Sequence, residues 1–170
     1  MIKGTFPIEK FRELETPFYY YDMKVLRDTL DTIKKEVSKY ENFHVHYAIK
    51  ANANPKILKV IREAGLGADC VSGGEVRASV EAGFPNDKIV FAGVGKTDKE
   101  INYALDHNIF CFNVESVPEL EIINELAAAK GKVAQWLSAS TRMSVHIHML
   151  ILLPAWQKTS SASAWKIWIP

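Results

Sequence analysis

The sequence predicts an α/β fold built on a parallel sheet, and two observations lead to this prediction. Between residues 43 and 130, four short apolar segments of strand length alternate with four longer amphipathic segments of helix length. Such alternation is typical of βα units, in which successive strands lie parallel. Gly65, Gly83 and Gly131 follow three of the helical segments, and glycine is the residue that most often closes a helix.

The predicted elements follow one another in a regular order. An extended, aromatic-rich segment at 16–21 leads through Asp22, a candidate N-cap, into a helix. The apolar stripe of this helix consists of Leu26, Leu30, Ile33 and Val37. The predicted strands are 43–50, 68–72, 88–93 and 109–114, and the helices that follow them are 55–64, 74–82, 98–108 and 118–130. A fifth strand is expected to begin at 132–135.

Composition and charge are those of an ordinary globular protein. The chain has 170 residues, of which 48% are hydrophobic, and a formal net charge of +1, so nothing electrostatic favours nucleic acid as a partner. Its start lacks the apolar core of a signal peptide, and the longest apolar run, 149–156, is too short to span a bilayer. We therefore expect a cytoplasmic protein with no membrane partner, in which Cys70 and Cys111 are reduced core thiols.

The character of the sequence changes near residue 135. All 20 acidic residues and all nine glycines lie within residues 1–135, whereas all four tryptophans lie within 136–170. The second segment has neither helical nor alternating periodicity. We therefore divide the chain into residues 1–135, which carry the βα pattern, and a tail at 136–170 that is expected to be unstructured.

Lys50 follows the first predicted strand, at the sheet edge where βα units gather functional side chains. Because lysine is costly to bury alone, this residue is either satisfied by neighbours, exposed to solvent or used as an amine, and the residues by themselves leave these readings open. His44 and His46 alternate with apolar residues along the strand. No third ligand is spaced to join them, so we expect no metal site.

Four motifs stand in order along the predicted units. They are Thr-Pro-Phe-Tyr-Tyr-Tyr-Asp at 16–22, Tyr-Ala-Ile-Lys-Ala-Asn at 47–52, Gly-Ala-Asp-Cys-Val-Ser-Gly-Gly-Glu at 67–75 and Asn-Val-Glu-Ser at 113–116. The ordered set resembles the diaminopimelate decarboxylases, a family of pyridoxal-phosphate enzymes. The resemblance implies that residues 1–135 are the amino-terminal part of a cofactor-binding (β/α)8 barrel of the TIM type, truncated after four to five βα units.

The same resemblance assigns roles to individual residues. Lys50 would form a Schiff base with pyridoxal 5'-phosphate, and Ala48 would line the cofactor. Asp69 and Glu75 would lie in the cofactor pocket, where carboxylates can orient the imine or its polar neighbours. From the residues alone, Asp69 reads equally well as a turn residue, and Glu75 as a first-turn acid favoured by the helix dipole.

The activity implied by the resemblance is decarboxylation of a small amino acid, meso-2,6-diaminopimelate, to L-lysine and carbon dioxide, the last step of lysine biosynthesis. Enzymes of the family act as homodimers. Ornithine, arginine or carboxynorspermidine decarboxylation within the same fold remains an alternative, as does a non-catalytic cofactor-binding barrel or an inert fragment. Since the family's later motifs do not appear in the chain, we expect it to be inactive as it stands.

The codons of the tail can also be interpreted in a shifted reading frame. When the last base of each codon is joined to the first two bases of the next, Ser138 to Ser144 permit Arg-Ile-Asn-Pro-Asn-Val, and Val145 to Leu150 permit Ala-His-Thr-His-Ala. Both sequences resemble motifs of the family at the places where those motifs belong. We therefore expect that one base was lost near the codons for Gln135 and Trp136, so that residues 136–170 are translated out of frame.

Overall fold

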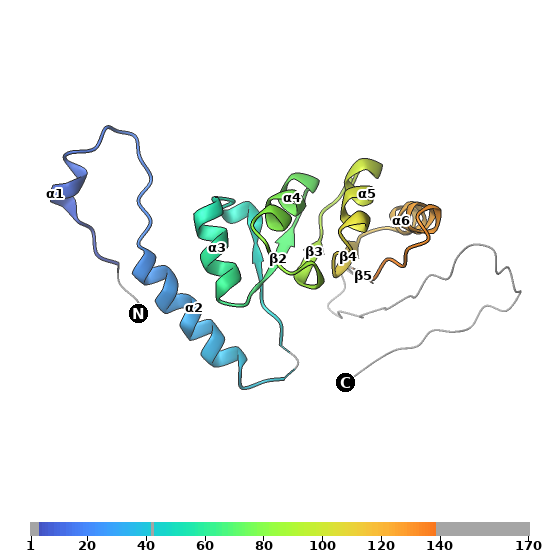
Figure 1. The fold of residues 1–170 in the computed structure, drawn as a ribbon, viewed down its shortest axis with the longest axis horizontal. Helices are drawn as coiled ribbons and strands as arrows, with labels where there is room; N and C mark the ends of the chain where they lie inside the picture. The colour runs from blue at the N-terminus through green and yellow to red at the C-terminus, as the bar shows by residue number, and fades with distance from the viewer. Residues whose placement is uncertain (1–3, 42, 139–170) are drawn as a thin grey trace, which may run out of the picture. The chain divides into compact units, whose positions relative to one another are not determined.

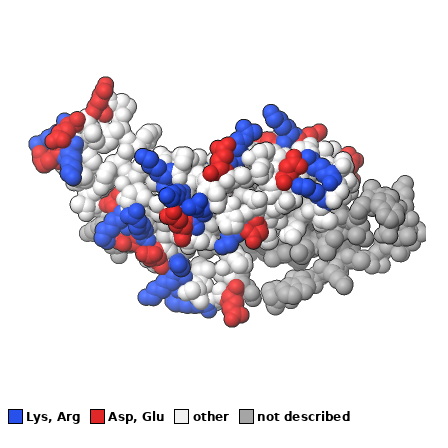
Figure 2. Space-filling model, viewed as in Figure 1, with Lys and Arg blue, Asp and Glu red and all other residues white. Residues whose placement is uncertain are grey.

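The computed structural model describes residues 4–41 and 43–138. These fall into two compact units, an amino-terminal unit that ends at His44 and a second unit that begins at Val45. Figure 1 shows the helices and strands of both units. Lysine and arginine side chains are interspersed with acidic ones over the face drawn in Figure 2. No helix among the described residues is both long and apolar enough to cross a bilayer.

The amino-terminal unit contains a short helix, α1 (Ile8–Phe11), and a long one, α2 (Met23–Val37). As predicted, Asp22 is the N-cap of α2, and its carboxylate accepts hydrogen bonds from the backbone N–H groups of Lys24 and Val25. A third N–H, that of Thr5, also donates to Asp22. These bonds favour the ionised carboxylate and hold the pKa of Asp22 below its ordinary value.

The second unit is a five-stranded, fully parallel sheet in the order β1-β2-β3-β4-β5. Helices α3 to α6 connect the strands in turn (Figure 1). The strands are β1 (His46–Ala48), β2 (Gly67–Cys70), β3 (Ile89–Phe91), β4 (Cys111–Val114) and β5 (Trp136–Ser138). The helices are α3 (Pro55–Glu63), α4 (Gly73–Glu81), α5 (Asp98–Asp106) and α6 (Val117–Ala129), with short 3-10 turns η1 (Ile49–Ala51) and η2 (Asn86–Lys88). This topology is the predicted one.

The core lies between the sheet and the helices. In β2, the thiol of Cys70 lies 3.3 Å from the hydroxyl of Ser79 on α4, so Cys70 belongs to the face that the helices cover. Register extends this face along the sheet, because Cys70 pairs with Phe91, and Phe91 with Phe112. Both phenylalanines are buried. Side chains alternate along a strand, so Ala48 and Asp69, which pair with each other, lie on the opposite face.

The predicted boundaries are correct for the helices to within about two residues, and the predicted glycine helix ends are confirmed by positive φ at Gly65, Gly83 and Gly131. The first strand differs more. It was predicted to extend to Lys50, yet it ends at Ala48 and is followed by the turn η1, so Lys50 lies in a turn rather than at the end of a strand. The backbone N–H of Asn52 donates to the carbonyl of Ile49 and closes this turn.

The fifth strand also lies elsewhere than predicted. It begins at Trp136, just after the segment 132–135, and pairs with β4 over three residues. The N–H of Phe112 donates to the carbonyl of Gln135 at its start. Residues 136–138, which were assigned to an unstructured tail, are therefore strand, because the free edge of β4 offers backbone donors and acceptors that a neighbouring segment satisfies. The remainder of the tail, 139–170, lies outside the described residues.

Candidate functional site

Lys50 is exposed and unpaired within the described part of the chain. It lies in the turn η1 at the carboxyl end of β1, and no hydrogen bond or ion pair from residues 4–41 or 43–138 engages its ammonium group. The neighbouring Ile49 is completely buried and anchors the turn in the core. The structure thus presents Lys50 as a free amine on a fixed backbone, as the use of an amine for Schiff-base chemistry requires.

Ala48 and Asp69 lie beside each other on the face of the sheet opposite the helices, here called the open face. They are register partners in the β1–β2 pair, and both side chains are half-buried. Ala48 contributes only a methyl group to this face, whereas Asp69 contributes a carboxylate. The structure therefore brings Asp69 and Ala48 together near the strand end that precedes Lys50.

The side chain of Glu75 is hydrogen-bonded to the backbone of the loop that precedes its helix. One carboxylate oxygen accepts a hydrogen bond of 2.9 Å from the N–H of Val71, and the N–H of Glu75 donates to the hydroxyl of Ser72, the N-cap of α4. This arrangement resembles a capping box and fixes the loop between β2 and α4. The structure thus places Glu75 at the same edge of the sheet as Asp69, with at least one oxygen engaged in holding the loop.

A second carboxylate links two neighbouring βα loops. Glu100, in the first turn of α5, forms a complete capping box with Thr97 and also accepts a 2.7 Å hydrogen bond from the N–H of Gly73. These backbone donors, from Thr97 first and then Gly73, lower the pKa of Glu100. A Cβ at Gly73 would lie only 2.4 Å from Cγ of Glu100, so the contact requires glycine there.

A buried lysine makes the next link. The ammonium group of Lys96, in the loop after β3, donates to the carbonyls of Gly93 and Asn113 at 2.7 and 2.9 Å and to the carboxylate of Glu119 at 2.5 Å. Its side chain is 1% exposed. The second oxygen of Glu119 accepts from the N–H of Glu115. Every proton of the ammonium group therefore has an acceptor, which makes burial of the charge tolerable.

These links form a rim of three successive βα loops at the carboxyl edge of the sheet. Lys96, Glu100 and Glu119 were not among the residues singled out from the sequence. A signal was present, because the pattern Ser/Thr-x-x-Glu, typical of a capping box, occurs after three strands in succession. The three copies are Ser72 to Glu75, Thr97 to Glu100 and Ser116 to Glu119. The cross-links between loops, however, depend on which strands are neighbours.

The chemistry of the site suits an aldehyde cofactor. An unpaired amine at Lys50, a small residue at Ala48 and a carboxylate at Asp69 share one edge of the sheet, and the rim holds the neighbouring loops in place. An imine needs the first of these groups, and charge-assisted hydrogen bonding uses the third. Among the described residues, no group of three metal-ligating side chains is close enough to bind a metal ion.

Comparison with known proteins places the chain among decarboxylases. Residues 25–153 match the family described as pyridoxal-dependent decarboxylase, pyridoxal binding domain. The diaminopimelate decarboxylase of Bacteroides thetaiotaomicron is 71% identical over 133 residues, which cover 78% of this chain and 34% of that protein. The enzyme of Aquifex aeolicus is 41% identical over 134 residues, or 79% of this chain and 31% of its own. The chain thus spans about a third of these relatives.

Solved structures agree with the sequence matches. Diaminopimelate decarboxylase from M. jannaschi superimposes with a TM-score of 0.74 at 36% identity, over 78% of this chain and 32% of that one. The Helicobacter pylori enzyme complexed with L-lysine gives a TM-score of 0.69 at 39% identity, over 76% and 32%. The predicted partial barrel and the resemblance to diaminopimelate decarboxylases are confirmed, and the chain belongs to the pyridoxal-dependent decarboxylase family.

Proposed function

We propose that this chain is the cofactor-anchoring part of a diaminopimelate decarboxylase, with Lys50 as the residue that holds pyridoxal phosphate. The observation that carries the proposal is the free amine of Lys50 at the carboxyl edge of a parallel sheet, next to Ala48 and Asp69. When bound, pyridoxal phosphate supplies an aldehyde that binds amines and a ring that withdraws electrons from the bond to the leaving carboxylate.

The residues of this chain would divide the remaining work among themselves. Lys50 would provide the amine that holds the cofactor, and the same amine, once released, would be able to carry a proton. Asp69 lies on the open face of the sheet, where its carboxylate orients a positively charged group through hydrogen bonding. Glu75 keeps the adjoining loop in position through Val71.

The substrate proposed is meso-2,6-diaminopimelate, with L-lysine and carbon dioxide as products. The relatives that share up to 71% identity bear this enzyme's name, and related structures from two organisms contain L-lysine. Because the chain spans about a third of those relatives, activity is proposed for the whole enzyme, as a homodimer in the cytoplasm, and not for residues 1–170 alone.

The out-of-frame origin of residues 136–170 remains part of this proposal. Its support is the ordered set of family motifs that the shifted codons permit. The family match reaches residue 153, inside this segment, and that observation would follow directly from an intact frame. Resequencing the encoding DNA across the codons for Gln135 and Trp136 decides between the two: an unaltered frame removes the shift.

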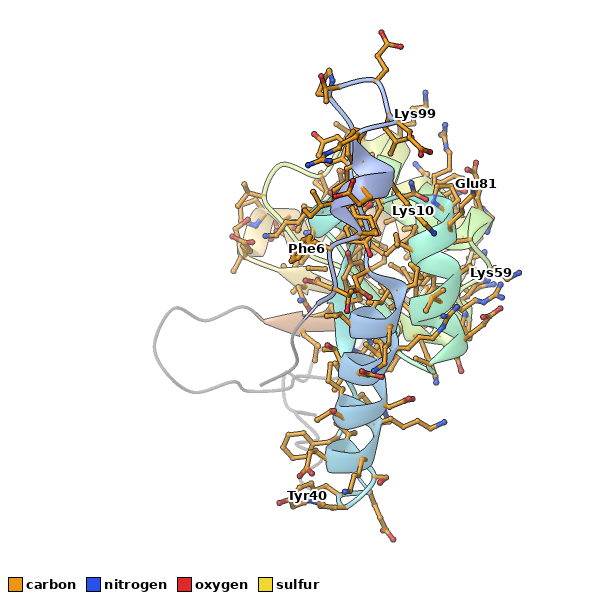
Figure 3. All side chains as sticks on the ribbon, turned by 90° about the vertical axis from the view of Figure 1, so that its left-hand side faces the viewer. Phe6, Lys10, Tyr40, Lys59, Glu81 and Lys99 are labelled. Atoms are coloured by element: carbon orange, nitrogen blue, oxygen red, sulfur yellow. The ribbon has the colours of Figure 1, made fainter. Side chains whose placement is uncertain are left out.

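The cofactor assignment can be tested on the chain itself. The protein is mixed with pyridoxal phosphate, reduced with borohydride and digested, and the labelled lysines are identified by mass spectrometry. We expect the label to concentrate on Lys50 and to disappear from that peptide in Lys50→Ala. The control is Lys59→Ala, since Lys59 is an exposed lysine of α3 that projects outward in Figure 3. Label spread evenly over surface lysines would contradict the assignment.

A further inference from the structure

A buried side-chain oxygen of β4 has no hydrogen-bond donor among the described residues. The side-chain oxygen Oδ1 of Asn113, in β4, is buried and accepts no hydrogen bond from any residue that the structure describes. A buried acceptor without a donor costs stability, and most buried polar groups of folded proteins have partners. An asparagine that carries this cost marks a position where a donor from outside the described chain is expected.

The register of the sheet places this side chain on the face opposite the helices. Cys70, Phe91 and Phe112 form one row on the face covered by helices, as the contact between Cys70 and Ser79 shows. Asn113 directly follows Phe112, so it lies on the opposite face. That face also carries Asp69, so the two polar side chains share it.

Hydrogen bonds also hold the backbone of Asn113 in place. Its backbone carbonyl accepts a 2.9 Å hydrogen bond from the buried ammonium group of Lys96, which Glu119 and the carbonyl of Gly93 hold in turn. On the other side, Asn113 pairs with Leu137 of β5. The backbone at Asn113 is therefore held on two sides, while its side chain is left without a partner for Oδ1.

The spacing of the strands gives the separation of Lys50 and Asn113 across the sheet. Lys50 follows the first strand and Asn113 lies in the fourth, which corresponds to three inter-strand spacings of about 4.8 Å, or about 14 Å along the sheet. A lysine side chain with a pyridine ring joined to its amine is long enough to approach that span. Asp69 of β2 lies on this face between them, and so does Ala92, which directly follows β3. The backbone N–H of Ala92 donates to the carbonyl of Cys70 and so continues the pairing of β3 with β2.

We propose that Asn113 is a cofactor-binding residue, whose Oδ1 accepts a hydrogen bond from the ring hydroxyl group of pyridoxal phosphate bound at Lys50. The inference rests on the proposed function and adds a residue to it. A residue that serves binding and not stability has a distinctive signature: its replacement weakens binding without weakening the fold.

The test compares two properties of the same variants of the full chain. Asn113→Val removes the orphan acceptor and has the higher strand propensity, so the urea midpoint of the cofactor-free protein should equal or exceed that of the original chain. The dissociation constant for pyridoxal phosphate, titrated by the absorbance of the bound imine, should rise about tenfold, the loss expected for one buried hydrogen bond. Asn113→Asp retains an acceptor oxygen and should bind more tightly than Asn113→Val.

The control is Asn124→Val, a half-buried asparagine on α6, which should leave the dissociation constant unchanged. Equal affinity of Asn113→Val and the original chain would overturn the inference, and so would a fall in its urea midpoint that matches the loss of affinity, since that indicates a structural role. Failure of the original chain to form any adduct at Lys50 is a different result: it rejects the proposed function and, with it, this inference.

Discussion

Two lysines at the same edge of the sheet illustrate what a protein does with a positive charge. Lys50 follows β1, is exposed and has no partner among the described residues, whereas Lys96 follows β3, is 1% exposed and donates to three acceptors. A lysine that is satisfied in this way holds structure together, and one that is left free can react. Five predictions test that difference, the loops around it and the core behind them, beginning with the largest effect.

Removing the buried lysine should have the largest effect on stability. In Lys96→Met, Glu119 is left as a largely buried carboxylate without its cation, and the carbonyls of Gly93 and Asn113 lose a donor. We expect the free energy of unfolding to fall by about 3–5 kcal/mol, measured by urea denaturation. Lys50→Met should change it by less than about 0.5 kcal/mol, as for an exposed side chain.

A double variant separates charge from packing at the same position. Lys96→Met combined with Glu119→Leu removes both charges, and such replacements of buried pairs are often neutral. We expect most of the lost stability to return. The control is Lys99→Met, because Lys99 is an exposed lysine on α5 that is labelled in Figure 3. If Lys96→Met proved as stable as this control, the contrast between Lys50 and Lys96 would be wrong.

Two adjacent glycines test the link between the loops. A methyl group at Gly73 would clash with Glu100, at 2.4 Å from its Cγ, whereas the nearest atom to a methyl group at Gly74 is Oγ of Ser72 at 3.8 Å. Gly73→Ala should therefore lower the free energy of unfolding by about 1–3 kcal/mol. Gly74→Ala should leave it unchanged or raise it by at most about 1 kcal/mol. Equal effects in thermal melts would show that the loops are not in contact as described.

The pH dependence of stability should depend on Glu100. Its pKa is lowered in the folded protein from an ordinary value of 4.5, so its contribution is present above that value and is lost as the pH falls through the lower folded pKa. The difference in urea midpoint between the original chain and Glu100→Gln should be largest near pH 7 and shrink below about pH 4. Glu81→Gln, at an exposed glutamate, should show no such trend; a constant difference at all pH values would exclude this role for Glu100.

The smallest effect concerns the thiols of Cys70 and Cys111, which are buried as predicted and are not joined in a disulfide. Burial raises the pKa of both Cys70 and Cys111 to about 12. The thiolate is the reactive form, so near pH 8 neither cysteine should react appreciably with iodoacetamide until the chain unfolds. Rapid labelling of either residue in the folded protein, followed by mass spectrometry, would place that thiol outside the core.

The local sequence alone determined much of this structure. Apolar periodicity, glycines in the left-handed conformation and the N-cap at Asp22 are properties of neighbouring residues, and the predicted helices and parallel strand order agree with the structure. The ordered set of four motifs likewise led to the correct family. The strand boundaries were less accurate, because strands end where their partners end.

Only the tertiary structure decided the role of the second lysine and of Asn113. Lys96 lies 17 residues from Asn113 and 23 from Glu119, so nothing in its local sequence distinguishes it from an exposed lysine. Parallel pairing brings the loops after β3 and β4 together, and that proximity buries the charge. The face on which Asn113 lies depends likewise on register across four strands, since a shift of one residue would turn its side chain toward the helices.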